Sequence, residues 1–247
     1  MTHAFPQTVL HTPRLTLRPF TADDTDDTRA ACSDDLTQHW LPLPRPYTRE
    51  DAHTWCTRTA HDLRTTGDGI HFAVTERTNG RLAATVGLKK TDWRSRSSEA
   101  GYWVAPRGLS SNSRLRADAG ARTSPRCRRS PMLRSGSLLR LAMHAPQRRP
   151  ARPPGGRREF EDRPQARGRG IAAEATRALA HWLLTEQAFE RLELKAATAN
   201  TASRRTALNA GLREEGVLRN AGFTHHGRTD LVLYSLVPGD LGLPPTA

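Results

Sequence analysis

The 247-residue chain is predicted to form a mixed α/β domain, and three patterns in the sequence predict this class. Residues 14–18 (RLTLR) alternate apolar and polar side chains, as a half-buried strand does. Residues 70–75 and 82–88 are two further strand-like runs on either side of Asn79-Gly80, a dipeptide typical of tight β-hairpins. Residues 171–183 carry apolar side chains every three or four positions, which indicates one buried face of an amphipathic helix. Strands and helices that alternate along the chain in this way favour a mixed α/β fold.

The other elements of the N-terminal part have signals of their own. Thr21 precedes two aspartates, and acidic residues in a first turn are stabilised by the helix dipole. Thr48 and Asp51 have the spacing of a capping box at the start of a second helix. The face that this helix would bury carries Ala52, Trp55, Cys56, Thr59 and Leu63. Residues 99–105 (EAGYWVA) predict another strand, which Pro106 ends.

The C-terminal part continues the alternation of strands and helices. Residues 192–197 predict a strand, and residues 201–210 predict a short helix that Gly211 ends. Residues 213–218 and 229–236 predict the last two strands. Together with the N-terminal elements, they complete one α/β domain over residues 10–240.

Nearly all of the net charge lies in one segment of the chain. The formal charge is +13, from 38 Lys and Arg residues against 25 Asp and Glu residues. Residues 107–164 contain fifteen arginines and four acidic residues, so this segment carries +11 and the rest of the chain only +2. The segment is rich in Pro, Ser and Gly and has one aromatic residue, Phe160, so it has little apolar surface to bury. We predict that residues 107–164 are a long, disordered, low-complexity insertion that interrupts the domain.

Several classes of protein are excluded or disfavoured by simple counts. Three cysteines, Cys32, Cys56 and Cys127, cannot form a closed disulfide framework. The N-terminus lacks the apolar stretch of a signal peptide, and no run approaches the roughly 20 apolar residues that a membrane helix needs. No spacing of ligands indicates a metal site, and His225-His226 is expected to be exposed in a connection between strands. We therefore expect a cytoplasmic protein without a membrane partner.

A glycine-rich string lies directly before the long amphipathic helix. Residues 165–170 (QARGRG) let the backbone approach a ligand closely, and the first amides of the helix point at that position without partners. With the helix dipole and the charges of Arg167 and Arg169, they predict an anion site that suits a pyrophosphate. The string matches neither the P-loop nor the dinucleotide-binding pattern. It also fits the end of the arginine-rich segment, so by itself it does not identify a site.

Several motifs in a fixed order resemble those of GNAT-superfamily N-acetyltransferases, in particular the RimJ/RimL-like branch that acetylates ribosomal-protein N-termini. The motifs are TPRLTLRPFTADD (12–24), EAGYWVAP (99–106), QARGRGIAAEA (165–175) and NTAS (200–203). They resemble the first strand and helix entry, the fourth strand, the acetyl-CoA loop with its helix, and the N-x-x-S motif of that branch. The resemblance covers about residues 10–106 and 165–240. It implies a mostly antiparallel sheet flanked by helices, and direct acetyl transfer from acetyl-CoA to a primary amine of a protein N-terminus or small molecule.

The resemblance also assigns roles to particular residues. The main chain of Trp103, Val104 and Ala105 would line the pantetheine arm of acetyl-CoA. The remaining residues expected to hold the cofactor are Gln165, Arg167, Gly168, Arg169, Gly170, Ile171, Ala172 and Asn200. Glu99 would be the base that deprotonates the amine, and Ser203 the acid that protonates the leaving thiolate. Three structural alternatives stay open: a solvated strand-edge carboxylate for Glu99, a helix N-cap for Ser203, and a turn residue for Asn200.

The 58-residue segment is a departure from the family, in which the fourth strand runs almost directly into the acetyl-CoA loop. It is either an insertion or a stretch translated in another reading frame. Closing a loop of about 60 residues instead of about 4 costs about 2.4 kcal/mol, so we expect the fold to survive with reduced activity. The alternative function is an impaired GNAT scaffold that binds RNA or ribosomes nonspecifically through the arginines of residues 107–164. A third possibility is a product that the segment prevents from folding.

Overall fold

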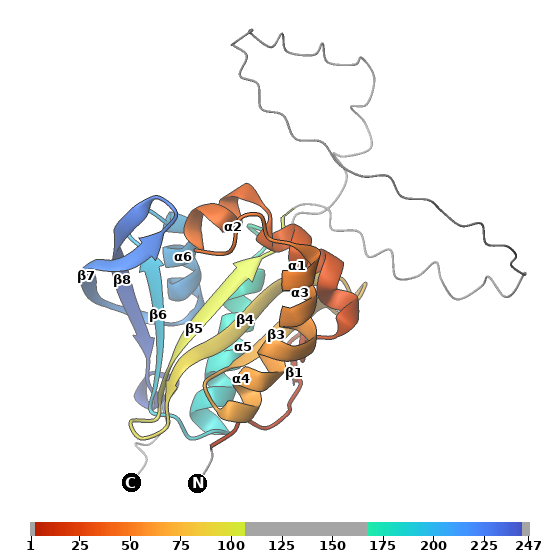
Figure 1. Cartoon of the computed structure of the whole chain (residues 1–247). Coiled ribbons are helices and arrows are strands. Elements are labelled where there is room, and N and C mark those ends of the chain that lie inside the picture. Colours follow the sequence, from red (N-terminus) through yellow and green to blue (C-terminus); the bar gives the residue numbers. More distant parts are fainter. Residues whose placement is uncertain (1–2, 107–166, 244–247) are drawn as a thin grey trace, which may run out of the picture. The chain divides into compact units, whose positions relative to one another are not determined.

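One mixed sheet is built from residues on both sides of the arginine-rich segment (Figure 1). The computed structural model describes residues 3–106 and 167–243. Over these residues, eight strands pair in the order β1-β2-β3-β4-β5-β6-β8-β7. The strands are β1 (Leu10–His11), β2 (Leu15–Arg18), β3 (Ile70–Glu76), β4 (Leu82–Asp92), β5 (Ser97–Val104), β6 (Arg191–Ala197), β7 (Arg213–Thr224) and β8 (Gly227–Leu236). The pairing of β5 with β6 is parallel and the other pairings are antiparallel, which confirms the predicted fold class.

Several helix ends lie where local signals in the sequence indicate, whereas the helix over Asp35–Trp40 and the π-helical turn inside the predicted second helix were not predicted. They are α1 (Thr25–Cys32), α2 (Asp35–Trp40), α3 (Arg49–Thr54), α4 (Ala60–Thr66), α5 (Ile171–Thr185) and α6 (Thr201–Ala210), and a π-helical turn, η2 (Trp55–Thr59), joins α3 to α4. The capping box before α3 is present, because the backbone N–H of Asp51 donates to Thr48 Oγ1 and that of Thr48 donates to Asp51 Oδ2. Gly211 ends α6 with a φ of +98°, which a glycine adopts without steric penalty.

Helices cover both faces of the sheet, and each face has its own hydrophobic core. Successive side chains of β3 point to opposite faces and so belong to different cores. Phe72 and Val74 belong to the main core, which includes α5. Ala73 points to the opposite face and packs with Phe20 and Cys56, beneath the helical run of α3, η2 and α4. In Figure 1, α1, α3 and α4 lie on one side of the sheet and α5 on the other.

The chain comes back together across the arginine-rich segment. Arg167 Nε, just before α5, donates to the carbonyl oxygen of Val104 at the end of β5 at 3.3 Å. The described residues on both sides belong to one compact unit. This confirms the expectation that the strand and the loop meet. Residues 107–164 lie outside the described residues, so their predicted disorder and the domain bounds of 10–240 stay predictions.

Candidate active site

The sheet opens between β5 and β6. Their register ends at the pair Ala100–Leu194. Beyond it, β5 stays paired with β4 as far as Val104, and β6 stays paired with β8 as far as Ala197. Beyond this point β5 follows β4 and β6 follows β8, and Figure 1 shows β5 and β6 separating toward α2. The edge of β5 from Gly101 to Val104 is therefore free of β6 and offers main-chain groups to an extended ligand.

The glycine-rich loop lies at the N-terminus of α5, next to the end of β5. Gly168 and Gly170 have φ angles of 80° and 74°, a region that glycine tolerates at no steric cost. The side chains of Ile171 and Ala172 are buried, and their amides belong to the first turn of α5, where backbone N–H groups lack partners within the helix. The N-terminus of a helix favours an anion, and the anion site at this loop stays a prediction.

Both arginines of the loop are held by acidic side chains. Arg167 Nη2 contacts Asp34 Oδ2 at 2.5 Å and Thr37 Oγ1 at 3.1 Å, and Arg169 pairs with Glu76. Burial by itself would raise the pKa of Asp34, but hydrogen bonds from Arg167 and Thr37 hold it below its usual value. The loop is thus tied to α2 and β3, and part of its positive charge is balanced. Sequence reasoning missed these partners, because Asp34 and Glu76 lie far from the loop in the chain.

A tyrosine from β5 meets the serine of the N-x-x-S motif. Tyr102 Oη donates to Ser203 Oγ at 2.8 Å, and its ring packs on the α5 side of the sheet. Burial raises the pKa of Tyr102, so the phenol stays protonated at neutral pH and acts as a donor. The bond reaches from the free part of β5 to the first turn of α6. Tyr102 is a candidate that the sequence analysis did not single out, although the alternation of EAGYWV places it opposite Trp103.

Asn200 is the residue that caps α6. Its Oδ1 accepts a hydrogen bond from the backbone N–H of Ser203 at 3.0 Å. The N-cap alternative for Ser203 is therefore wrong, and Asn200 is a helix cap rather than a plain turn residue. With this arrangement the Ser203 hydroxyl needs no role in capping and stays available at the site.

Glu99 is neither solvated nor free. Its side chain is about 7% exposed, and its oxygens contact Lys89 Nζ at 3.0 Å, Lys195 Nζ at 3.1 Å and Lys90 Nζ at 3.3 Å. Burial by itself would raise the pKa of Glu99, but the charge and hydrogen bond of Lys89, followed by those of Lys195, lower it to about 2. The alternative of a solvated carboxylate is wrong. A carboxylate of this pKa is also a poor proton acceptor near neutral pH, which argues against the predicted base.

The remaining predicted features give no further site. His225 and His226 are exposed in the turn between β7 and β8, and His225 Nε2 lies 2.9 Å from the carbonyl oxygen of Leu43. Within residues 3–106 and 167–243, no group of three or more His, Cys, Asp or Glu side chains could hold a metal ion. In the same residues, no helix is long and apolar enough to cross a membrane. Gln165 lies outside the described residues, and the cytoplasmic location stays a prediction.

The sequence of the chain matches the family model described as an acetyltransferase (GNAT) domain over residues 14–113 and 148–213, about two thirds of its length. The chain belongs to this family. The matched ranges enter both ends of the predicted insertion, so the part unlike the GNAT domain is narrower than 107–164. Among curated protein sequences, none matches this GNAT protein.

Solved structures of acetyltransferases share the fold of this GNAT domain. RimJ of Mycobacterium smegmatis, in complex with CoA-disulfide, has 16% identity and a TM-score of 0.63, over 95% of this chain and 90% of that chain. The ribosomal-protein-S5-alanine acetyltransferase of Vibrio fischeri has 13% identity and a TM-score of 0.59, over 93% and 96%. The microcin C7 self-immunity acetyltransferase MccE, in complex with acetyl-CoA and AMP, has 14% identity and a TM-score of 0.60, over 92% and 93%. Similarity at these identities establishes the fold.

Proposed function

We propose that this GNAT domain is an acetyl-CoA-dependent N-acetyltransferase that acetylates a primary amine by direct attack. The observation that carries the proposal is the opening between β5 and β6 beside the glycine loop of α5. An extended thioester arm can pair with the free edge of β5 while its pyrophosphate lies at the helix N-terminus. The complexes of RimJ with CoA-disulfide and of MccE with acetyl-CoA support this choice of donor.

The loop and the strand would share the cofactor between them. The N–H of Val104 would face the pantetheine arm, whereas its carbonyl already accepts from Arg167 Nε. The main chain of Trp103 points toward β4, as does that of Ala105, whose amide donates to the carbonyl of Ala83 at 2.8 Å. Among the loop residues predicted to hold the cofactor, Gly168, Gly170, Ile171 and Ala172 would offer their backbone amides to phosphate. Arg167 and Arg169 would bind the cofactor phosphates either in place of their acidic partners or together with them. Asn200 caps α6 through Oδ1, and its side-chain N–H groups stay available for the cofactor.

The reaction needs a nucleophile, a site for the oxyanion and a proton for the leaving group. The neutral amine attacks the thioester carbonyl, and the resulting oxyanion accepts hydrogen bonds from free N–H groups of β5. The C–S bond then breaks, Ser203 gives its proton to the departing thiolate, and the extra proton on the nitrogen of the new amide passes through solvent water to restore the Ser203 hydroxyl. Tyr102, which donates to Ser203 Oγ, stabilises the negative charge that develops on that oxygen. Glu99 keeps Lys89 and Lys195 in place and takes no proton.

We propose a protein or peptide N-terminal amine as the acceptor, in preference to a small-molecule amine. Support comes from the sequence resemblance to the RimJ/RimL-like branch and from the shared fold with the ribosomal-protein-S5-alanine acetyltransferase. An α-amine has a pKa of about 8, so a useful fraction is neutral at physiological pH, whereas a lysine amine near 10.4 is almost fully charged. This difference suits a site in which Glu99 is not a base.

The test uses the full chain. Isothermal titration should give saturable binding of acetyl-CoA, and a peptide that begins with alanine should gain 42 mass units, about the mass of one acetyl group that replaces hydrogen, in a time-dependent reaction. A folded protein, shown by circular dichroism, that binds no acetyl-CoA would refute the proposed function. A protein that binds acetyl-CoA but acetylates spermidine instead of the peptide would refute only the acceptor.

The charge of +11 on residues 107–164 supports a second candidate function, nonspecific binding of RNA. Phosphate contacts by arginines release counterions, so the affinity should fall steeply with salt. Binding of a structureless RNA should be lost when residues 107–164 are deleted. RNA affinity that survives the deletion would contradict this assignment.

A further inference from the structure

The turn between β1 and β2 lies against the N-terminal end of α5. The N–H of Thr12 donates to the carbonyl oxygen of Leu15 at 3.0 Å, and the N–H of Leu15 donates to Thr12 Oγ1 at 2.9 Å. The N–H of Arg77, just after β3, donates to the carbonyl oxygen of Arg14 at 2.9 Å. These bonds fix the backbone of the turn, from which the side chains of Thr12 and Arg14 reach the first turn of α5.

A carboxylate in that first turn accepts hydrogen bonds from both side chains. Thr12 Oγ1 donates to Glu174 Oε1 at 2.5 Å, and Arg14 Nε donates to Glu174 Oε2 at 2.6 Å. A second nitrogen of the same guanidinium, Nη2, also pairs with Glu174 Oε2. Burial by itself would raise the pKa of Glu174, but the hydrogen bonds from Thr12 and Arg14 hold it below its usual value. The carboxylate is therefore ionised at neutral pH and holds the guanidinium of Arg14 in one orientation.

The third nitrogen of the guanidinium contacts the glycine-rich loop itself. Arg14 Nη1 donates to the carbonyl oxygen of Arg169 at 3.0 Å. This carbonyl and the N–H of Gly170 belong to one planar trans peptide, in which the two groups point in opposite directions. By holding the carbonyl of Arg169, Arg14 fixes the direction in which the N–H of Gly170 donates.

A peptide that precedes a glycine needs such a restraint. Gly170 has a φ of 74°, and a Cβ there would lie 3.8 Å from Arg14 Nη2, an ordinary contact. Glycine is thus favoured here by the backbone conformation and not by lack of space. Because glycine adopts positive and negative φ about equally well, the peptide between Arg169 and Gly170 can turn over when its carbonyl has no partner. It would then present an oxygen to an anion in place of an N–H group.

We propose that Arg14 is a positioning residue for the pyrophosphate of acetyl-CoA: it holds the carbonyl of Arg169 so that the N–H of Gly170 stays directed at the pyrophosphate. Glu174 and Thr12 in turn hold Arg14 and the turn that carries it. This inference rests on the proposed function and adds a residue from the first hairpin to the cofactor side of the site. Arg14 acts from the carbonyl side of the peptide, whereas Arg167 would bind the phosphates itself.

The test compares Arg14→Met, which removes the guanidinium from a side chain of similar length, with Arg14→Lys, which keeps the charge but not the planar fork. Arg14→Met should weaken the binding of acetyl-CoA in calorimetry by about tenfold to a hundredfold, the range for hydrogen bonds to charged groups. Arg14→Lys should recover only part of this loss. The KM for acetyl-CoA should rise in both variants, and kcat with a peptide that begins with alanine should stay the same.

A truncated donor separates positioning of the pyrophosphate from a general structural role. S-acetylpantetheine has the same thioester arm as acetyl-CoA but no pyrophosphate. Arg14→Met should therefore acetylate the peptide from this donor with the kcat/KM of the wild type. A variant with a damaged fold would lose activity with both donors.

Glu174→Ala gives a test in which the sign of the effect decides. By charge alone, loss of an acidic group beside the loop would strengthen the binding of an anionic cofactor. Glu174→Ala also releases Arg14 from its ionic partner, so the affinity for acetyl-CoA should fall instead.

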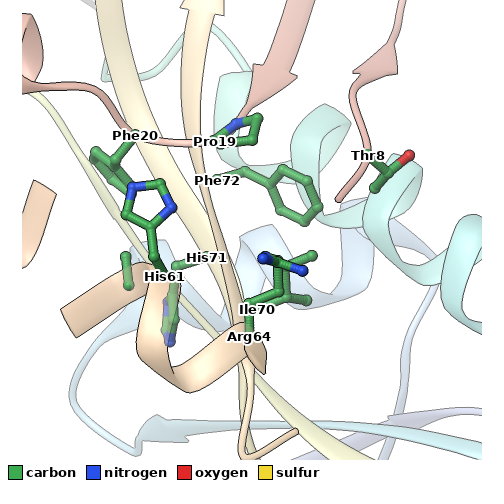
Figure 2. A pocket seen from close by; sticks show the side chains of 9 residues that line it. Thr8, Pro19, Phe20, His61, Arg64, Ile70, His71 and Phe72 are labelled. Carbon is green, nitrogen blue, oxygen red and sulfur yellow. The ribbon is translucent and has the colours of Figure 1, made fainter. Parts of the chain in front are cut away.

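Arg64→Met is the matched control. Arg64 lines the small cavity of Figure 2, and its Nη1 also donates to a main-chain carbonyl, that of Phe5, at 2.9 Å. Phe5 packs on Trp182 in the last turn of α5, with 6.1 Å between ring centroids. The loop lies before the other end of this helix, which is about 22 Å long. Arg64→Met should therefore leave the Kd of acetyl-CoA unchanged, whatever its effect on Tm.

The inference is overturned if Arg14→Met binds acetyl-CoA as tightly as the wild type, or if Arg14→Lys restores the full affinity. It is also overturned if Arg14→Met loses activity equally with both donors, or if Glu174→Ala strengthens binding. A wild-type protein that binds no acetyl-CoA would instead refute the proposed function, and the inference with it.

Discussion

Replacement of Tyr102 by phenylalanine removes one oxygen from the pair that we propose for protonation of the thiolate. The bond from Tyr102 Oη to Ser203 Oγ is 2.8 Å long, the usual length for two hydroxyl groups. Between neutral groups, such a bond contributes about 1 kcal/mol. In the transition state, Ser203 Oγ carries developing negative charge, and a charged acceptor raises the contribution to about 1.5–3 kcal/mol.

Tyr102→Phe should therefore lower kcat by about tenfold to a hundredfold. Ser203→Ala removes the acid itself and should cost about 10²–10⁴. The double variant should be no slower than Ser203→Ala, because Tyr102 acts only through Ser203. An acetyl donor with a more acidic thiol needs less protonation, so both single variants should lose less activity with such a donor.

The assay measures initial rates of peptide acetylation from pH 6 to 9, with acetyl-CoA affinity from calorimetry and Tm from thermal unfolding. Tyr234→Phe is the matched control, because that hydroxyl is bonded to Arg204 of the same helix at 3.1 Å but not to Ser203. It should leave kcat unchanged. Additive losses in the double variant, or a loss of rate in Tyr102→Phe that only follows its loss of stability, would refute the coupling of Tyr102 to Ser203.

Three other changes give distinct readouts. Asp34→Asn keeps a good cap for α2 but removes the carboxylate that pairs with Arg167. The affinity for acetyl-CoA should therefore rise about fivefold in calorimetry. Weaker binding would contradict the idea that the Asp34 carboxylate competes with the cofactor phosphate for Arg167. Glu99→Gln should lower the free energy of unfolding by about 1–3 kcal/mol at pH 7 and reduce kcat by less than about tenfold, whereas a true base would cost 10²–10⁴. The pKa of Glu99 is lowered to about 2 in the folded protein, so the ionised carboxylate stabilises the fold above its unfolded pKa of about 4.5. This stabilisation is lost as the pH falls toward 2. Urea unfolding across that range should show the free energies of unfolding of the wild type and Glu99→Gln becoming equal. Deletion of residues 107–164 should raise the free energy of unfolding by about 2 kcal/mol and strengthen acetyl-CoA binding. Unchanged values would mean that the segment neither destabilises the fold nor weakens cofactor binding.

Local signals were sufficient for several element boundaries. The capping box at Thr48 and Asp51, the hairpin at Asn79-Gly80 and the end of α6 at Gly211 were all predictable. Each depends on hydrogen bonds or φ angles within about four residues, so neighbours in the chain carry the whole of the information. The order of several such motifs was enough to indicate the GNAT family.

The chemistry of the site depends on contacts that no local pattern contains. Tyr102 and Ser203 meet only because α6, which packs on α5 and β6, brings its first turn next to β5. Arg167 contacts Asp34 across more than a hundred residues of chain. The sequence by itself determined the class of fold, the family and the position of the glycine loop. Tertiary structure alone decided that Glu99 lies among three lysines from neighbouring strands, and the charges of Lys89 and Lys195, which outweigh the effect of burial, are what lower its pKa.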